Sequence, residues 1–217
     1  MRKTQSPIYK YIESVLPAES QDKKRARFAS EKIGLDAISI STTEAHIIQW
    51  ITQLIKPQKI VEIGTLTGLS SLYFLESLTE NGHLWTFEKS KEHSELAAEN
   101  LYKYIKSNQC TIVVGDAVQT LPSINHQGPF DVIFIDGNKS AYYDYWIWAK
   151  NNINKDGFIF IDNSFLAGAV WGNQDVQKFN DKQINNVKKM TTEIFEDLNF
   201  KSSFVPTLEG LIVSQKI

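Results

Sequence analysis

Short apolar runs alternate with longer segments of helical periodicity through most of the chain. After residue 59, each run is followed by a polar turn and then by apolar residues at helical spacing. The runs that we interpret as strands are residues 60–63, 84–87, 111–114, 132–135 and 158–161. Strands that alternate with helices form parallel sheets with right-handed crossovers. The pattern therefore predicts an α/β fold with a mostly parallel sheet and helices on both faces.

The two ends of the chain depart from this alternation. Residues 1–56 show helical periodicity without a strand, and the capping-box sequence STTE at 41–44 predicts a helix that ends before Pro57. At the other end, residues 200–205 and 211–214 predict an antiparallel hairpin at the edge of the sheet. The expected architecture is therefore a seven-stranded sheet with extra N-terminal helices.

A charged stretch occupies residues 19–32. Its basic residues are Lys23, Lys24, Arg25 and Arg27. Acidic residues lie close by in sequence, so we interpret the stretch as the solvated face of a helix. A basic RNA-binding patch is the alternative interpretation.

Length, charge and cysteine usage narrow the class of protein. At 217 residues the chain fits one domain, residues 1–217, with an N-terminal helical segment (1–56) and a core (57–217). With a formal net charge of −2, the chain lacks the excess of basic residues that is typical of nucleic-acid-binding proteins. The single cysteine, Cys110, is expected in the core and fits a reducing cytoplasm. The four histidines lack metal-ligand spacing, the N-terminus lacks a secretory signal, and no apolar run could span a bilayer.

Residues 60–70, IVEIGTLTGLS, combine a predicted strand with a glycine turn that opens a helix. Gly64 and Gly68 would let a ligand approach the backbone closely, and the helix N-terminus adds unpaired N–H donors. A dinucleotide fingerprint needs G-x-G-x-x-G, and its middle glycine is absent here. The negative charge of Glu62 would also be unfavourable beside a pyrophosphate. Glu62 suits a positive or hydrogen-donating group, such as the amino-acid half of S-adenosylmethionine.

Four successive strands end in acidic residues. These are Glu88, Asp116, Asp136 and Asp162. The carboxyl ends of parallel strands lie along one rim, so the four carboxylates are expected to converge on one crevice, although each alone could be a helix N-cap. Glu88 lies about 20 residues beyond the glycine turn, where a carboxylate can accept both hydroxyls of a ribose. Asp116 with Ala117 could receive the exocyclic amine of an adenine.

Asp136, Asp162 and Asn163 offer three oxygen ligands from neighbouring strand ends. No histidine or cysteine is close in sequence, so the set favours a hard divalent cation such as Mg²⁺, Mn²⁺ or Ca²⁺. Lys139 follows Asp136 by one turn and could reach the same place. A surface salt bridge is the alternative for this lysine.

These motifs together resemble the cation-dependent, S-adenosylmethionine-dependent O-methyltransferases, a family that includes catechol and caffeoyl-CoA O-methyltransferases. The resemblance runs from about residue 41 to the C-terminus and rests on EIGTLTGLS, DVIFIDGNKSAYYDY, GFIFIDNSFLAGAVWG and VPTLEGLIVSQK, in that order. It implies a Rossmann-like class I methyltransferase fold and, because family members are usually homodimers, a homodimer. The chain departs from the family pattern at Asn138, at Glu209 and at residues 38–40, where substrate preference is affected.

The resemblance also implies roles for individual residues. Those implied to hold S-adenosylmethionine are Glu62, Gly64, Thr65, Gly68, Ser70, Glu88, Asp116, Ala117 and Asp136. Those implied to ligate the metal are Asp136, Asp162 and Asn163. Lys139 would be the catalytic base or hydroxyl-orienting group, together with Asp136. Tyr145 and residues 165–171 would shape the substrate entrance.

The implied reaction is in-line transfer of a methyl group from the sulfonium to a hydroxyl of a small phenol. A divalent cation lowers the pKa of that hydroxyl, and a second adjacent oxygen on the same cation predicts catechol-like substrates. The first alternative is the same chemistry on a hydroxylated tRNA nucleoside, with residues 23–27 and 188–189 as its candidate basic surface. The lower alternatives are an NAD-type oxidoreductase and a non-catalytic adenosyl-nucleoside binding protein.

Overall fold

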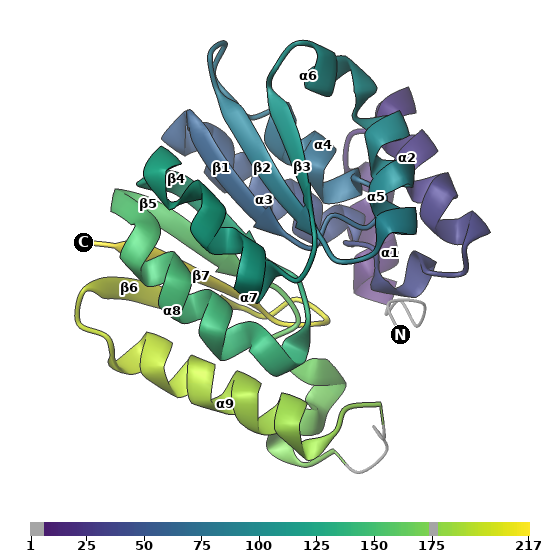
Figure 1. The fold of residues 1–217 in the computed structure, drawn as a ribbon. Coiled ribbons are helices and arrows are strands. Elements are labelled where there is room, and N and C mark those ends of the chain that lie inside the picture. The colour runs from purple at the N-terminus through teal and green to yellow at the C-terminus, as the bar shows by residue number, and fades with distance from the viewer. Residues whose placement is uncertain (1–6, 174–177) are drawn as a thin grey trace.

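A seven-stranded sheet runs through the middle of the molecule (Figure 1). The structure is a computed structural model that describes residues 7–173 and 178–217. The strands are β1 (Lys59–Ile63), β2 (His83–Glu88), β3 (Cys110–Val114), β4 (Phe130–Ile135), β5 (Ile153–Ile161), β6 (Phe200–Val205) and β7 (Leu211–Lys216). Their order across the sheet is β3-β2-β1-β4-β5-β7-β6.

The sheet is parallel except at one strand. Strands β1 to β5 pair in parallel, whereas β7 is antiparallel to both β5 and β6. The predicted seven-stranded, mostly parallel sheet with a C-terminal antiparallel hairpin is therefore confirmed. The strand order changes direction between β1 and β4, which is where sheets of this kind open a ligand crevice at their carboxyl ends.

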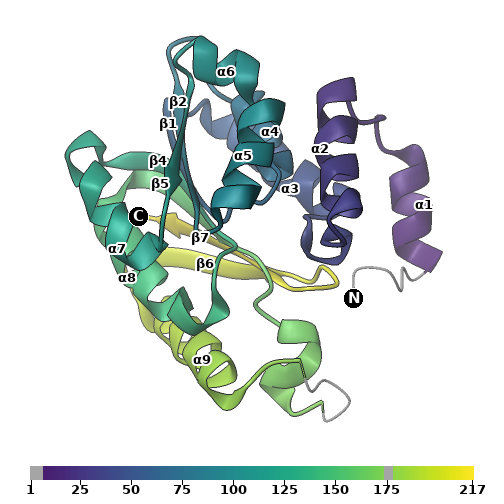
Figure 2. The ribbon, with the colours of Figure 1, turned by 45° about the vertical axis from the view of Figure 1, so that its right-hand side comes forward.

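Helices cover both faces of the sheet, as predicted. The α-helices are α1 (Pro7–Val15), α2 (Gln21–Lys32), α3 (Thr42–Ile55), α4 (Leu69–Leu75), α5 (Lys91–Asn100), α6 (Tyr102–Lys106), α7 (Ala117–Thr120), α8 (Tyr142–Asn152) and α9 (Asp181–Glu196). The 3-10 turns are η1 (Asp36–Ile38), η2 (Leu121–Gln127), η3 (Lys139–Ala141) and η4 (Leu166–Trp171). Figure 2 shows α7, α8 and α9 on one face and α2 to α6 on the other, with α1 outermost.

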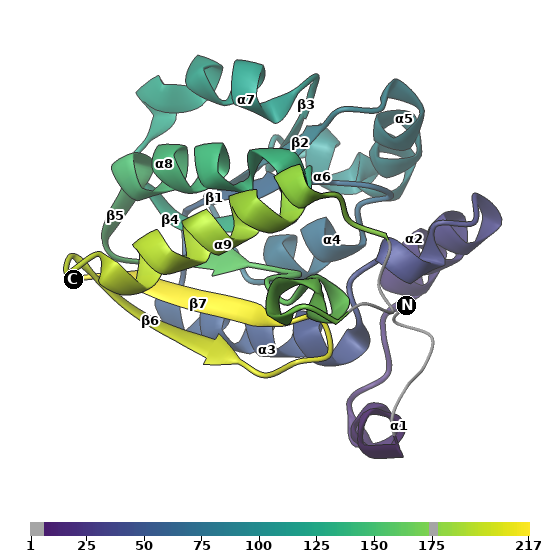
Figure 3. The same ribbon diagram turned by 90° about the horizontal axis from the view of Figure 1, so that it is seen from below.

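Each face of the sheet has its own hydrophobic core. In β4, Ile133 and Ile135 pack into the core under α8 and α9, whereas Val132 and Phe134 pack into the core under α3 and α4. Burial on both faces explains why this strand is a continuous apolar run rather than an alternating one. Figure 3 shows α9 alongside α8 and the β6–β7 hairpin, where it covers the antiparallel end of the sheet.

Two predicted boundaries differ from the structure. The helix expected over residues 91–105 is divided at Leu101 into α5 and α6, where Leu101 has a non-helical ψ of 5°. The Leu101 side chain is fully buried and packs against Gly68. The strand expected at 158–161 begins at Ile153. Polar residues interrupt the apolar pattern in the first half of β5, so the sequence carries no strand signal there. In the structure Asp156, within this half, has a left-handed φ of 64°.

The interpretation of residues 19–32 as a solvated face is wrong for two of its basic residues. Lys23 is 6 % exposed and its ammonium pairs with the Glu76 carboxylate of α4 at 2.5 Å. Arg27 pairs with Glu19 and is mostly enclosed. Lys23 is buried and Arg27 is half-buried, each against an acidic partner that sequence periodicity does not reveal. Lys24 and Arg25 face solvent, as expected.

Several local predictions are confirmed. Ser41 is the N-cap of α3: its hydroxyl accepts the Glu44 N–H at 3.2 Å and donates to the Glu44 carboxylate at 2.7 Å. Cys110 is buried at the start of β3, and burial raises the pKa of its thiol to about 12. Within residues 7–173 and 178–217, no helix is long and apolar enough to cross a bilayer. The assignment of residues 1–217 to a single domain stays a prediction.

Candidate active site

A cavity of about 350 Å³ lies at the carboxyl ends of the parallel strands. Seven of the residues singled out from the sequence line it. They are Gly64, Glu88, Asp116, Ala117, Asp136, Lys139 and Asn163. The prediction that the strand-end acids converge on one crevice therefore holds for Glu88, Asp116 and Asp136. It is wrong for Asp162, which is fully buried and does not line the cavity. Tyr145 and Ala167 also line the cavity, in agreement with the predicted entrance.

The glycine turn between β1 and α4 is packed against the end of β4. A Cβ on Gly64 would lie 2.3 Å from the Asp136 carbonyl oxygen, and Gly64 has a φ of +105°. Gly68 is the N-cap of α4 with a φ of +84°. Only glycine suits either position, so the turn brings bare backbone to the cavity floor beside Asp136.

Glu62 lies behind this turn and does not line the cavity. Its carboxylate is fully buried and accepts hydroxyl hydrogen bonds from Ser70 and Thr86, at 2.5 and 2.6 Å, and from Ser71. Burial raises the pKa of Glu62 to about 7, against the opposing effect of the three hydroxyls. The Thr65 hydroxyl joins the same group through Thr86 at 2.6 Å. These residues fasten the first turn of α4 to β1 and β2.

The Glu88 carboxylate is fixed on the cavity wall by two backbone groups. It accepts the N–H of Leu66 at 2.9 Å and that of Ser90 at 2.8 Å. His93 of α5 lies 3.7 Å away through Nδ1. A carboxylate held in this way presents its oxygens in a fixed direction.

Asp116 combines the two interpretations that the sequence left open. It is the N-cap of α7, accepting the Val118 N–H at 3.1 Å, and it lines the cavity with Ala117. Lys89 reaches its carboxylate at 3.1 Å.

Lys139 is part of the cavity wall rather than of the open surface. Its ammonium donates to Asp136 Oδ1 at 2.8 Å and to the Tyr142 hydroxyl at 2.6 Å. The Tyr142 hydroxyl in turn donates to the Asp162 carbonyl oxygen at 3.1 Å. Lys139 and Asp136 are 15 % and 16 % exposed, so the pair is shielded yet open to the cavity. The alternative of a surface salt bridge is therefore not supported.

Asp162 and Asn163 begin the loop after β5. Asp162 is fully buried and accepts the Asn163 N–H at 2.6 Å, whereas Asn163 lines the cavity with a left-handed φ of +58°. The loop is tied to the hairpin by the Ser164 N–H, which donates to the Gly210 carbonyl oxygen at 2.8 Å.

The donor set here fits a hard cation. Among the described residues, no three His, Cys, Asp or Glu side chains gather as a metal site. A cation would therefore depend on two carboxylates, Asp136 and Asp162, and the Asn163 amide oxygen. All-oxygen sets of this kind suit Mg²⁺ or Ca²⁺ and leave positions for water and substrate.

Further lining residues had no predicted site role, although Ile38, Asn138 and Glu209 among them were singled out from the sequence as departures from the family pattern. They are Ala37, Ile38, Ile63, Leu66, Phe87, Lys89, His93, Gly115, Gly137, Asn138, Lys178, Phe179 and Glu209. The N-cap Ser90, which accepts the His93 N–H at 3.3 Å, is a local signal that could have placed His93 near Glu88. Ala37 carries no such signal, because it comes from η1, outside the alternation of strands and helices.

Comparisons with known proteins agree with the predicted family. A family model described as O-methyltransferase matches residues 17–217. A catechol O-methyltransferase from Niastella koreensis is 33 % identical over 162 residues, which cover 74 % of this chain and 73 % of that one. A caffeoyl-CoA O-methyltransferase from Stellaria longipes is 23 % identical and covers 97 % of this chain and 90 % of its own length.

A solved structure shows the same fold. The O-methyltransferase from Bacillus cereus in complex with SAH superposes with a TM-score of 0.88 at 24 % identity, and each chain is covered completely. The alternatives of an oxidoreductase and a non-catalytic binding protein gain no support from these comparisons. The chain belongs to the O-methyltransferase family and is an S-adenosylmethionine-dependent O-methyltransferase.

Proposed function

We propose that the protein transfers the methyl group of S-adenosylmethionine to a hydroxyl of a small catechol-like phenol, with the help of a divalent cation. The observation that carries this proposal is the Lys139–Asp136 pair at 2.8 Å, set in the same cavity as Asn163 and Glu88. This arrangement offers oxygen ligands for a hard cation beside a side chain that can bind an acceptor hydroxyl. The names of the relatives, catechol and caffeoyl-CoA O-methyltransferase, support the acceptor class.

The methyl donor would lie along the wall from the glycine turn to α7. Glu88 would accept the ribose hydroxyls, and Asp116 with Ala117 would meet the adenine. Gly64 would present backbone to the methionine half, with Asp136 beside it. The residues Glu62, Thr65, Gly68 and Ser70 were predicted to contact the donor. In this proposal they do not contact it but stabilise the glycine turn that does.

Asp136, Asp162 and Asn163 would hold the cation. When bound, a divalent cation lowers the pKa of a phenolic hydroxyl and so increases its nucleophilicity. Lys139 orients the acceptor oxygen or, in its neutral form, takes its proton, and Tyr142 holds the lysine in the cavity. Fixing the acceptor in line with the donor supplies a further part of the rate enhancement.

Methylation of a tRNA nucleoside remains the alternative, and the structure gives it less support. Its candidate basic surface included Lys23 and Arg27, which are paired with Glu76 and Glu19. Lys189 lies over the Tyr143 ring at 3.6 Å, and Lys188 remains exposed. The homodimer and the cytoplasmic location stay predictions.

The test is methyl transfer from labelled S-adenosylmethionine to a panel of catechols, with Mg²⁺, with EDTA and with Asp162→Ala. We expect turnover that requires the cation and is lost in the variant. Donor binding without turnover on any phenol would move the acceptor class to undermodified tRNA. If the protein does not bind S-adenosylmethionine or its product, the proposal is wrong.

A further inference from the structure

Part of the cavity wall comes from η1, which precedes the sheet in the sequence. Ala37 and Ile38 line the cavity, yet Ile38 is 46 % exposed. An isoleucine that stays almost half exposed gains only part of the free energy that full burial would give. The position of this wall therefore depends also on how the chain is held next to η1.

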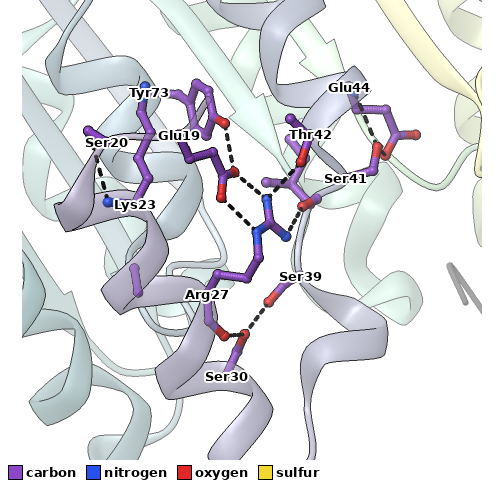
Figure 4. Close-up of polar contacts among 12 residues, drawn as sticks. Glu19, Ser20, Lys23, Arg27, Ser30, Ser39, Ser41, Thr42, Glu44 and Tyr73 are labelled. Atoms are coloured by element: carbon purple, nitrogen blue, oxygen red, sulfur yellow. Dashed lines mark hydrogen bonds and ion pairs between the residues drawn. The ribbon is translucent and has the colours of Figure 1, made fainter. Parts of the chain in front are cut away.

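Contacts from α2 hold the residues directly after η1. The Ser39 hydroxyl donates to the Ser30 hydroxyl at 2.8 Å. The Arg27 guanidinium donates to the Ile40 carbonyl oxygen and to the Thr42 hydroxyl, both at 3.3 Å. Figure 4 shows Arg27 reaching from its helix to this neighbouring segment, with the Ser30–Ser39 contact below it. One arginine and one serine of α2 thus fasten the exit of η1.

Arg27 is itself fixed by a buried carboxylate. Its Nε and Nη2 donate to the two oxygens of Glu19 at 2.9 and 2.5 Å, the two-pronged geometry that holds a guanidinium most firmly. The Tyr73 hydroxyl of α4 donates to the same carboxylate at 2.8 Å. Burial would raise the pKa of Glu19, but hydrogen bonds and charge from Arg27 lower it, so the carboxylate stays ionised.

The same helix contacts the glycine turn. The Thr67 hydroxyl donates to the Ala26 carbonyl oxygen at 2.9 Å. Asn100 donates to the Thr67 carbonyl oxygen at 2.9 Å and accepts a hydrogen bond from Arg25 at 3.0 Å. Adjacent residues of α2 therefore hold the turn after β1 and the segment after η1, each of which directly follows residues that line the cavity.

We propose that Arg27 is a positioning residue for the cavity. It does not line the cavity, but it holds the η1 wall at a set distance from the glycine turn, and the affinity for the S-adenosyl ligand depends on that spacing. The inference rests on the proposed function, because it needs that ligand to occupy the cavity.

The test compares Arg27→Lys with Lys24→Met by calorimetric titration of S-adenosylhomocysteine. A lysine keeps the positive charge beside Glu19 but cannot bind its carboxylate in a fork and also reach Ile40 and Thr42. We expect Arg27→Lys to raise the Kd for S-adenosylhomocysteine about tenfold. Lys24 is exposed on the same helix, so Lys24→Met should leave the Kd unchanged.

A double-mutant cycle separates positioning from general loosening of the fold. If Arg27 acts through the η1 wall, Arg27→Lys combined with Ile38→Ala should raise the Kd by less than the product of the single effects. If the rise in Kd for the double variant equals the product of the two single rises, the proposal is contradicted. If Arg27→Lys does not fold, as judged by its thermal transition, Ser39→Ala takes its place in the cycle.

The two proposals fail in different ways. If the unmodified protein does not bind S-adenosylhomocysteine, the proposed function and this inference both fall. If it binds and Arg27→Lys binds equally well, only the positioning role of Arg27 is wrong.

Discussion

Two of the side chains in the cavity region show how its groups are held. The Lys139 ammonium donates hydrogen bonds to Asp136 Oδ1 and to the Tyr142 hydroxyl, so its position in the cavity is fixed from two sides. Glu62 is enclosed instead, with three hydroxyl donors and no place on the cavity wall. The first residue should therefore control turnover and the second should control stability.

Lys139→Met should lower kcat by about 10²- to 10³-fold, within the range for a lost proton-transfer group. The Kd for S-adenosylhomocysteine should change little, since the variant keeps the length of the side chain. Steady-state kinetics with a catechol and calorimetry provide the two numbers, and Lys182→Met on exposed α9 is the control. A variant that keeps its kcat would remove Lys139 from the proposed chemistry.

Glu62→Gln should change how stability depends on pH. Because the folded-state pKa of Glu62 is about 7 and its ordinary value is 4.5, the folded protein holds this proton more tightly than the unfolded chain. Its stabilising contribution is complete below pH 4.5 and is lost as the pH rises to about 7, by at most roughly 3 kcal/mol. The variant should lack this decline.

Urea unfolding of both proteins at several pH values between 4.5 and 8 measures this difference. Glu92→Gln, an exposed residue in the first turn of α5, should follow the unmodified protein. Parallel curves for all three proteins would mean that Glu62 does not titrate in this range.

Among the elements, the β1–α4 turn has the least freedom to change. Gly64→Ala should cost roughly 3 kcal/mol of unfolding free energy and abolish donor binding, because its Cβ would meet the Asp136 carbonyl at 2.3 Å. Gly34→Ala is the matched control: Gly34 also has a positive φ, +71°, but open space where the Cβ would stand. It should cost about 1 kcal/mol, the strain of the backbone alone. Equal losses of unfolding free energy would show that contact with Asp136 is not the cause.

The sequence predicted elements well where the signal was local. The strands β1 to β4 are short apolar runs, and β2 to β4 have acids at or just beyond their ends. Burial on both faces of the sheet produces such runs directly. The role of α2 could not be predicted in this way, because Lys23 finds Glu76, and Arg27 finds Ile40 and Thr42, through the tertiary fold. The first half of β5 was missed for a related reason, since its polar residues join the sheet only through pairing with β4.

The whole molecule should respond to its ligands in two separable ways. S-adenosylhomocysteine at 100 times its Kd should stabilise the folded state by about 2.7 kcal/mol and raise the thermal midpoint. EDTA should leave most of this shift intact while it abolishes turnover, because Glu88, Asp116 and Gly64 are proposed to bind the donor alone. Of the proposed cation ligands, Asp136 is the one that would also lie beside the donor. Thermal unfolding and the methyl-transfer assay, run on the same samples, compare the two responses. Loss of the ligand-induced shift in EDTA would mean that donor and cation share one site.

The place of β7 between β5 and β6 has a consequence for the order in which the protein matures on the ribosome. β6 is synthesised before β7 but joins the sheet only through it, and the loop bearing Asn163 is tied to Glu209 and Gly210, just before β7. Emerging chains that already contain the glycine turn and every strand-end acid thus still lack the segment that anchors the acceptor side. We therefore expect capture of the acceptor to be a late event, coupled to arrival of the final strand, whereas the proposed donor contacts belong to the parallel half.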